Sequence, residues 1–188
     1  MAIVQKETIK GITHEVRSAG NSIRLYTDGV FHSQFNPLHP VGGHLWDLLM
    51  LPMFFVDPEK VRRVLVLGAG GGAVMRQLAY FTSMAEIIGV DNNHWHLAAA
   101  RKYFGIQGPP FRLYEADAVE WVSQYSGDRF DLVIDDLYGE CEGEPSRAVD
   151  TNELWFKCMS RLLKPMGVLA INFLDHQSLV RSSWYNHR

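Results

Sequence analysis

The chain has 188 residues, of which 47% are hydrophobic and 21% are charged, and this composition excludes a disordered or fibrous protein. Its 18 Lys and Arg side chains against 21 Asp and Glu leave a net charge of -3, so the chain lacks the basic field that holds DNA or RNA. Two cysteines are too few for a disulfide framework or a zinc site. We therefore expect a cytoplasmic protein with no nucleic-acid partner.

The longest apolar stretch, residues 45–56, is interrupted by Asp47 and Pro52 and falls short of the roughly 20 residues that cross a bilayer. The N-terminal segment MAIVQKETIK has no apolar core of the kind that signal peptides carry. We expect no membrane partner and no export.

Residues 1–57 form the first predicted unit. Between residues 8 and 36, short β-like runs alternate with turn signals at Ala19–Asn21 and Asp28–Gly29, which predicts a small antiparallel β region. Apolar residues at helical spacing follow in residues 43–51 and predict a linker helix. We place the domain boundary near residue 58.

Residues 58–188 form the second predicted unit, in which five apolar runs alternate with helix-like segments. Continuous runs of Val, Ile and Leu belong to strands that are buried on both faces, and their alternation with helices predicts a parallel sheet with right-handed crossovers. The fold class is therefore an open, doubly wound α/β sheet, whose ligands bind at the carboxyl ends of the strands. The predicted strands are RVLVLG (63–68), EIIGVD (86–91), FRLYEA (111–116), FDLVID (130–135) and GVLAINF (167–173).

A glycine-rich segment, Gly68–Ala73, follows the first of these strands and enters a helix. Glycines there allow a sharp turn and expose amide N–H groups at the start of the helix, which predicts cofactor contacts from Gly68, Gly70 and Gly72. The segment fits the G-x-G-x-x-A pattern of dinucleotide-binding proteins as well as it fits the G-x-G-x-G loop of adenosylmethionine-dependent transferases. A tight turn that serves packing alone is the alternative.

Carboxylates follow three of the other strands. Asp91 ends the second strand, at the place where a carboxylate accepts the ribose hydroxyls of either NAD or adenosylmethionine. Asp117 is placed to accept from the adenine amine, to cap the helix that follows, or to do both. Asp135 and Asp136 end the fourth strand, and we group Asp135 with the cofactor-binding residues. So many carboxylates suit a cationic sulfonium cofactor and would repel the phosphates of a dinucleotide.

Asp136 is the candidate general base. It directly ends a buried strand, where burial and the neighbouring Asp135 raise the pKa of the pair. The segment 135–144 contains three further acids and no Lys or Arg. It either lines a cleft that concentrates a polyamine or another cation, or it leaves its glutamates as a solvated loop tip.

No metal site is predicted. His94 and His96 are two residues apart on a predicted helix and face different directions, and His32, His39 and His44 lack carboxylate or cysteine partners at ligand spacing. We expect most of these histidines on the surface or in the cleft.

The most specific pattern is the order and spacing of six segments, which are LYTDGVFHSQF followed by His44, VLVLGAGGGAVMRQL, GVDNNHWHLAAARKYFG, EADAVEWV, FDLVIDD and LLKPMGVLAINF. Together they resemble the spermidine synthase (polyamine aminopropyltransferase) family over nearly the whole chain. The resemblance implies a Rossmann-like methyltransferase fold with strand order 3-2-1-4-5. It also implies that Asp91 binds the ribose and Asp117 the adenine amine, and that Gln34 and His44 face the cofactor. Asp136 corresponds to the acid that takes a proton from the attacking amine.

The chain departs from the family at three glycines. Gly71 stands where the family's glycine loop has an acid that holds the amino end of decarboxylated adenosylmethionine, Gly139 replaces the second acid of a D-S-S-D-P loop, and Gly43 replaces a tyrosine. With bare N–H donors at Gly71 and no opposing charge, the loop favours a cofactor that keeps its carboxylate.

A further departure is that the sequence stops shortly after the fifth strand, so we do not expect the family's final antiparallel hairpin. The sheet edge that this exposes is then covered by residues 179–184 or by a partner subunit in a homodimer, or the fold is a shortened form.

The favoured function is a spermidine-synthase-like transferase that uses adenosylmethionine or its decarboxylated form and no metal. It moves an aminopropyl group to a small amine acceptor, with Asp136 as the base. The first alternative is a methyltransferase of a small molecule, and the second is a catalytically inactive nucleoside-binding or assembly module. A nicotinamide-dependent oxidoreductase is a distant third.

Overall fold

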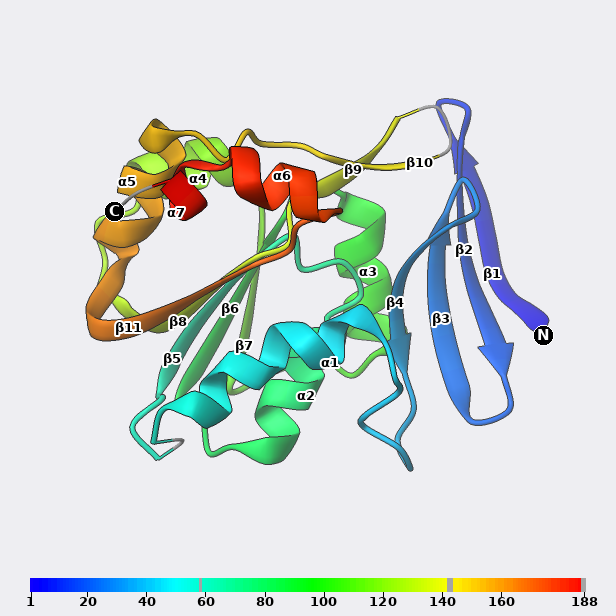
Figure 1. Cartoon of the computed structure of the whole chain (residues 1–188). Helices are drawn as coiled ribbons and strands as arrows, with labels where there is room; N and C mark the ends of the chain where they lie inside the picture. Colours follow the sequence, from blue (N-terminus) through cyan, green and yellow to red (C-terminus); the bar gives the residue numbers. More distant parts are fainter. Residues whose placement is uncertain (58, 142–143, 187–188) are drawn as a thin grey trace.

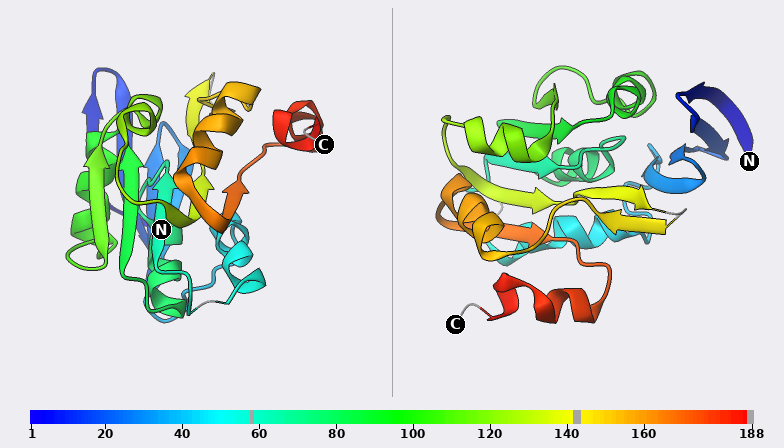
Figure 2. Two further views of the ribbon diagram at one scale, coloured as in Figure 1. Left: turned by 90° about the vertical axis from the view of Figure 1, so that its left-hand side faces the viewer. Right: turned by 90° about the horizontal axis from the view of Figure 1, so that it is seen from above.

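The computed structural model describes residues 1–57, 59–141 and 144–186, whose arrangement is shown in Figure 1. A small antiparallel sheet stands beside a larger parallel sheet that carries helices on both faces. The N-terminus lies at the outer edge of the antiparallel sheet, and the C-terminus lies at the opposite side of the molecule (Figures 1 and 2).

The antiparallel sheet confirms the predicted β region and adds one strand to it. Both predicted turns connect neighbouring strands of this sheet. The additional strand is the first, whose side chains are almost all exposed and therefore give no periodic apolar signal. It is held by its ladder to the second strand. In sheet order the strands are β1 (Ala2–Ile9), β2 (Ile12–Ala19), β3 (Ser22–Thr27) and β4 (Val30–Phe35).

The parallel sheet confirms the predicted strands and their order 3-2-1-4-5. All four neighbouring pairs run parallel. The last strand starts at Leu163, earlier than predicted, and its register with its neighbour breaks between Leu163 and Val168. From edge to edge the strands are β7 (Phe111–Glu115), β6 (Glu86–Asp91), β5 (Arg63–Leu67), β8 (Phe130–Asp135) and β11 (Leu163–Ile171).

Helices cover both faces of the parallel sheet because alternate residues of the central strands point to opposite sides. The helices are α1 (Leu45–Met50), the 3-10 turn η1 (Leu51–Phe55), α2 (Ala73–Phe81), α3 (His94–Tyr103), α4 (Ala118–Gln124) and α5 (Glu153–Leu162). Val64 and Val66 of β5 pack with α1, α2 and α3, while Leu65 and Leu67 pack with α4 and α5.

The N-terminal segment shares a hydrophobic core with the parallel sheet. Val16 of β2 and Leu25 of β3 are fully buried in the same cluster as Val64 and Val66. A division into residues 1–57 and 58–188 stays a prediction, and residue 58 itself lies outside the described residues.

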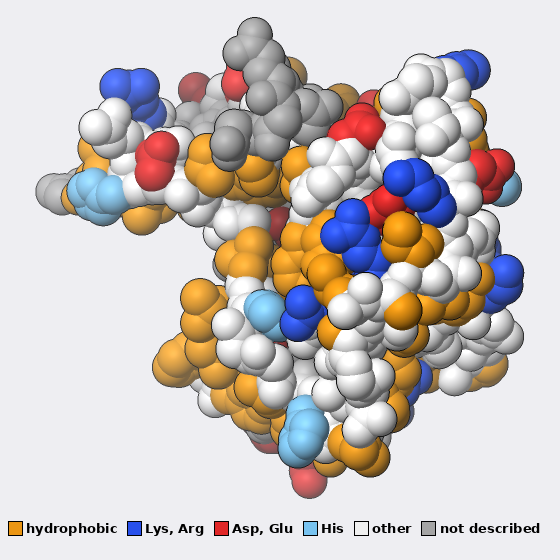
Figure 3. Space-filling view, turned by 90° about the vertical axis from the view of Figure 1, so that its right-hand side faces the viewer, with side chains coloured by type: hydrophobic (Ala, Val, Ile, Leu, Met, Phe, Trp, Pro, Cys, Tyr) orange, Lys and Arg blue, Asp and Glu red, His pale blue; other side chains and the backbone are white. Residues whose placement is uncertain are grey.

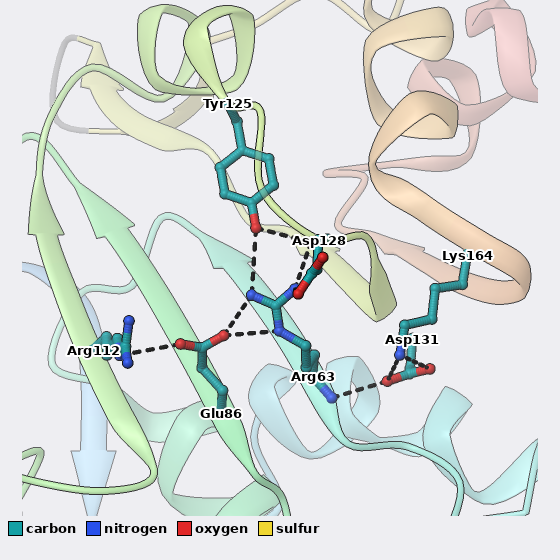
Figure 4. A network of polar contacts seen from close by, with 7 residues as sticks. All are labelled: Arg63, Glu86, Arg112, Tyr125, Asp128, Asp131 and Lys164. Carbon is teal, nitrogen blue, oxygen red and sulfur yellow. Dashed lines mark hydrogen bonds and ion pairs between the residues drawn. The ribbon is translucent and has the colours of Figure 1, made fainter.

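A network of ion pairs joins the amino ends of the parallel strands (Figure 4). The Arg63 guanidinium on β5 donates to Glu86 Oε2 of β6 from Nε at 2.8 Å and from Nη2 at 2.6 Å. Arg112 of β7 pairs with Oε1 of the same glutamate at 3.1 Å. Lys164 of β11 bonds both oxygens of Asp131 of β8, each at 2.9 Å. Strong polar contacts therefore fix this end of the sheet and leave the carboxyl ends for the site.

Two further pieces surround those carboxyl ends. An antiparallel hairpin of β9 (Tyr138–Cys141) and β10 (Glu144–Arg147) follows β8. The chain ends with α6 (His176–Arg181) and α7 (Ser183–Asn186), which lie beyond β11 at the edge of the sheet (Figure 2). The ring of Trp184 packs on Phe156 of α5, with 4.3 Å between the ring centroids, so the tail contacts α5, and what covers the sheet edge stays a prediction.

Candidate active site

A cleft of about 600 Å³ opens at the carboxyl ends of β5, β6 and β8. The turn between β3 and β4 and the start of α1 bound it on the side of the N-terminal sheet, and the β9–β10 hairpin bounds it on another. Leu45 of α1 and Leu174, just before α6, also line it. Figure 3 shows the surface hollowed below the projecting C-terminal segment. The cleft thus lies where doubly wound sheets bind their ligands.

Four carboxylates from different elements line this cleft. Asp91 ends β6, Asp136 directly follows β8, Asp117 precedes α4, and Asp28 lies in the turn between β3 and β4. Among the described residues, no Lys or Arg lines the cleft with them. Three of the four acids singled out in the sequence, Asp91, Asp117 and Asp136, therefore meet in one cavity, whose field favours a cation. The sequence did not single out Asp28, because Asp-Gly is a common turn pair and the turn alone accounts for an aspartate at this position.

The amides of the glycine segment are all engaged within the protein. Gly68 and Ala69 donate to the carbonyl of Val90 at 2.9 and 3.1 Å, and Gly72 donates to the Ala69 carbonyl at 2.8 Å. Gly70 N–H donates to Asp91 Oδ2 at 2.7 Å, and Gly71 N–H donates to Ser33 Oγ at 2.8 Å. The expectation that Gly71 offers a bare donor is therefore wrong, because a serine from the N-terminal sheet has taken it.

Close packing requires glycine at two of these positions. A Cβ on Gly68 would overlap the backbone carbonyl of Asp136, and the positive φ of 82° at Gly68 also favours glycine. A Cβ on Gly71 would lie 2.7 Å from Ser33 Cβ and 3.3 Å from Phe104 Cε1. Ser33 thus occupies the space that a side chain at position 71 would need. Gly68 and Gly70 line the cleft, whereas Gly72 starts α2 outside its lining.

Asp91 is held in place by two amide hydrogen bonds. Its Oδ2 accepts from Gly70 N–H, and its Oδ1 accepts from Asn93 N–H at 2.8 Å. Burial raises the pKa of this carboxyl, and the two amides oppose that rise. The cap of α3 is Asn93, whose side chain accepts from Trp95 and His96 amides. Asp91 is therefore not used as a helix cap and presents its carboxylate to the cleft.

Asp117 caps a helix, which is one of the two roles expected for it. Its Oδ1 accepts from the amides of Val119 at 2.8 Å and Glu120 at 2.9 Å, at the first turn of α4. Oδ2 takes part in neither bond, and Asp117 also lines the cleft. The cap fixes the carboxylate at the cleft wall and leaves one oxygen for a ligand.

Asp136 combines burial with a single strong orienting contact. Asn172, which follows β11, donates from Nδ2 to Asp136 Oδ1 at 2.8 Å. Burial raises the pKa of Asp136 to about 6, the negative charges of Asp135 and Asp91 add to the rise, and the Asn172 bond and the Arg147 charge oppose it. This is the range in which a carboxylate works as a general base near neutral pH. Sequence reasoning missed Asn172 because a polar residue at a strand end carries no motif.

Asp135 has a different environment from the one expected. It is fully buried and does not line the cleft. Both of its oxygens accept from Arg147 Nη2, at 3.0 and 2.9 Å, and Oδ2 also accepts from Trp155 Nε1 at 2.9 Å. The sequence assigned Asp135 to the cofactor, but its carboxylate instead forms an internal ion pair that ties the hairpin to the sheet.

Gln34 and His44 line a separate small cavity of about 50 Å³ and not the cleft. Arg24 on the neighbouring strand donates to Gln34 Oε1 at 2.7 Å. Asp47 accepts from the amides of Gly43 at 2.6 Å and His44 at 3.1 Å, which fixes the loop before α1. The expectation that Gln34 and His44 face the cofactor does not match this placement. His32, two residues before Gln34, lines the cleft in its place.

Residues 138–141 of the acidic segment 135–144 form β9, and residue 144 begins β10. The sequence left open whether the glutamates of this segment line a cleft or form a solvated loop tip, and both stay predictions. Glu142 lies outside the described residues, so the attraction of a polyamine to these glutamates stays a prediction.

In the described ranges, no three His, Cys, Asp or Glu side chains are grouped to hold a metal ion. Within the same ranges no helix has the length and apolarity needed to cross a membrane.

The sequence matches a family model and curated proteins. The family model described as "Methyltransferase domain" matches residues 58–187. Polyamine aminopropyltransferase 2 of Caldanaerobacter subterraneus subsp. tengcongensis is 28% identical over 144 residues, which cover 75% of this chain and 48% of that protein. The chain thus spans about half the length of this curated relative.

Solved structures share the fold. A probable spermidine synthase from Corynebacterium glutamicum superposes with a TM-score of 0.78 at 17% identity, covering 95% of this chain and 67% of that one. A spermidine synthase in complex with the transition state analogue AdoDATO superposes with a TM-score of 0.69 at 17% identity, covering 98% and 60%. These comparisons confirm the resemblance seen in the sequence and the fold class.

Proposed function

Because the chain belongs to the methyltransferase-domain family, we propose that its cleft binds decarboxylated adenosylmethionine and that the protein transfers the aminopropyl group to a small amine. The observation that carries this proposal is the convergence of Asp28, Asp91, Asp117 and Asp136 on one cleft whose described lining has no Lys or Arg. A sulfonium nucleoside and a polyamine are both cations, and both gain from such a field.

The donor without a carboxylate fits this cleft better than adenosylmethionine itself. A carboxylate group needs amide donors or a cation. The five amides of residues 68–72 are all engaged within the protein, and the described lining offers no Lys or Arg. An amino group at the same end of the donor would meet carboxylates instead. The proposal therefore reverses the preference that the sequence suggested for a carboxylate-bearing cofactor.

Three of the four acids have a role that their contacts support. Asp91, held by the amides of Gly70 and Asn93, accepts from the ribose hydroxyls, and the free Oδ2 of Asp117 accepts from the adenine amine. Asp136 takes a proton from the amine nucleophile, whose lone pair then forms a C–N bond. The electron pair of the broken C–S bond goes to sulfur, and a neutral thioether leaves. Because the sulfonium is already a good leaving group, positioning supplies most of the catalysis.

A methyltransferase of a small molecule is the second candidate, and one observation favours it. Gly71 leaves no room for the acid that the aminopropyltransferase family places there, since Ser33 fills that space. The same cleft, base and sulfonium chemistry would serve attack on a methyl group.

The test is product analysis of the purified protein with putrescine and either donor. We expect methylthioadenosine and an aminopropylated amine with the decarboxylated donor, and we expect the Asp136→Asn variant to lose about 10²-fold or more of this rate. Asp57→Asn, an exposed carboxylate outside the cleft, is the matched control. Methyl transfer from adenosylmethionine alone would favour the second candidate. No product from either donor, with nucleoside binding retained, would favour an inactive module.

A further inference from the structure

Polar side chains of the N-terminal sheet meet α3 at the wall of the cleft beside Asp91, where Thr27 and His96 are both lining residues and His14 lies behind them. His14 of β2 and His96 of α3 are only 5% and 6% exposed, and Thr27 at the end of β3 lies between them. The His14 ring also stacks on Trp95, with 5.0 Å between the ring centroids. His14 therefore belongs to a buried group that the proposed reaction does not use.

Thr27 connects the two histidines through one oxygen. Its Oγ1 lies 3.0 Å from His14 Nδ1 and 2.7 Å from His96 Nε2. A hydroxyl has a single hydrogen. Thr27 therefore donates its hydrogen to one imidazole and accepts a hydrogen bond from the other. If both histidines donated to Thr27, the hydroxyl hydrogen would have no imidazole nitrogen to bond.

Asp91 decides between the two arrangements. The second ring nitrogen of His96, Nδ1, faces Asp91 Oδ1 across 3.9 Å, and both side chains are about nine-tenths buried. A lone pair on Nδ1 would point at a negative charge in a low dielectric, whereas an N–H there would be attracted to it. Nδ1 thus carries the hydrogen, Nε2 accepts from Thr27, and Thr27 accepts from His14 Nδ1–H.

The charge state of His96 agrees with this arrangement. Burial lowers the pKa of His96 to about 3, and the charge of His14 adds to the fall. At neutral pH the ring therefore carries one hydrogen, whose place the neighbours choose. His32, whose ring centroid lies 4.8 Å from that of His96, has its pKa lowered to about 4, chiefly by burial, so it adds no positive charge.

We propose that Thr27 and His96 are positioning residues for Asp91: the N-terminal sheet, through Thr27, holds the His96 N–H toward the carboxylate and so sets the orientation in which Asp91 accepts from ribose hydroxyls. This inference rests on the proposed binding of a nucleoside in the cleft. It assigns to the N-terminal sheet a part in ligand recognition that requires no direct contact between Thr27 Oγ1 and the ligand.

Binding calorimetry with methylthioadenosine and its 2′-deoxy analogue tests this role. Wild-type protein should prefer the ribose form, and Thr27→Val should lose about tenfold of that preference, the effect of one hydrogen bond. Thr27→Ser keeps the hydroxyl and should restore the preference. Thr8→Val removes a hydroxyl from the same sheet that pairs only with Thr13 among the contacts observed, and should leave it unchanged. An equal loss of affinity for both ligands in Thr27→Val would show a merely structural role and overturn the inference.

Nitrogen NMR of the ligand-free wild-type protein separates this inference from the proposed function. We expect the hydrogen of His96 on Nδ1 in the wild type and in Thr27→Ser, because the Asp91 carboxylate faces Nδ1. A wild-type hydrogen on Nε2 would overturn the inference even if the nucleoside binds. If neither nucleoside binds the wild type, the proposed function fails, and a hydrogen on Nδ1 would still support the positioning of Asp91.

Discussion

Asn172 donates a hydrogen bond from Nδ2 to Oδ1 of Asp136, at 2.8 Å, across the gap between β11 and β8. The backbone carbonyl of the same asparagine accepts from Tyr138 Oη at 3.1 Å and from Arg147 Nη1 at 2.8 Å. The β9–β10 hairpin therefore fixes Asn172, and Asn172 fixes the proposed base. Its amide also stabilises the charged form of Asp136 and so opposes the rise in pKa that burial causes.

This relationship predicts how the reaction depends on pH. In the wild type, the rate should rise with pH through the pKa of about 6 of Asp136, because only the carboxylate accepts a proton. In Asn172→Ala, the charged form loses its hydrogen bond, so the rising limb should move to higher pH by about one unit. Rate profiles from pH 5 to 8 measure the shift. A limb at unchanged pH would mean that Asp136 is not the titrating group.

Asp136 should also lower the stability of the protein at neutral pH. Its pKa in the folded state is raised above the unfolded value, so the folded state binds the proton more tightly, and stability falls as the pH rises from about 4 to 6. Asp136→Asn removes this effect and keeps an oxygen to accept from Asn172. We expect the variant to gain about 3 kcal/mol in unfolding free energy at pH 7 and much less at pH 4.

Urea unfolding at both pH values checks this prediction. A gain of the same size at pH 4 and pH 7 would contradict a titration effect.

Ser33 and Gly71 should behave as a coupled pair. A Cβ at position 71 would meet Ser33 Cβ at 2.7 Å, so Gly71→Ala should cost about 1–3 kcal/mol of unfolding free energy through overpacking. In a Ser33→Gly background the clash with Ser33 disappears, and the same substitution should cost less. A double-mutant cycle by urea unfolding measures the coupling. Additive effects would show that Ser33 does not limit position 71.

We expect Arg147 to stabilise the fold through its buried ion pair with Asp135. Asp135 is 0% exposed and Arg147 is 13% exposed, and removal of one partner leaves a buried charge uncompensated. We expect Arg147→Ala to cost about 3–5 kcal/mol of unfolding free energy. Lys157→Ala breaks the exposed pair with Glu153 and should cost less than about 1 kcal/mol. Similar losses in both variants would contradict the structural role of the Asp135–Arg147 pair.

The sequence predicted the parallel sheet well because its signals are local. Continuous apolar runs such as residues 63–67 and 86–91 mark strands that are buried on both faces. Asp91, Asp117 and Asp136 lie at the ends of such strands or just beyond them, so the topology alone brings them to one edge. Their arrival in a common cleft was therefore predictable from the order of the elements.

The errors arose where long-range contacts decide the structure. Whether Gly71 N–H is free depends on Ser33, which is 38 residues away, and the burial of Asp135 depends on Arg147 across the hairpin. Gln34 and His32 alternate with Ser33 along one strand, and only the packing of that strand decides which of them reaches the cleft. No local pattern reports contacts of this kind.

The most direct test of the central claim is a calorimetric comparison of the two sulfonium donors on the wild-type protein. The cleft is lined by carboxylates, and the amides of its glycine segment are already engaged. We therefore expect decarboxylated adenosylmethionine to bind at least about tenfold more tightly than adenosylmethionine, a difference of about 1.4 kcal/mol. Tighter binding of adenosylmethionine would contradict the account.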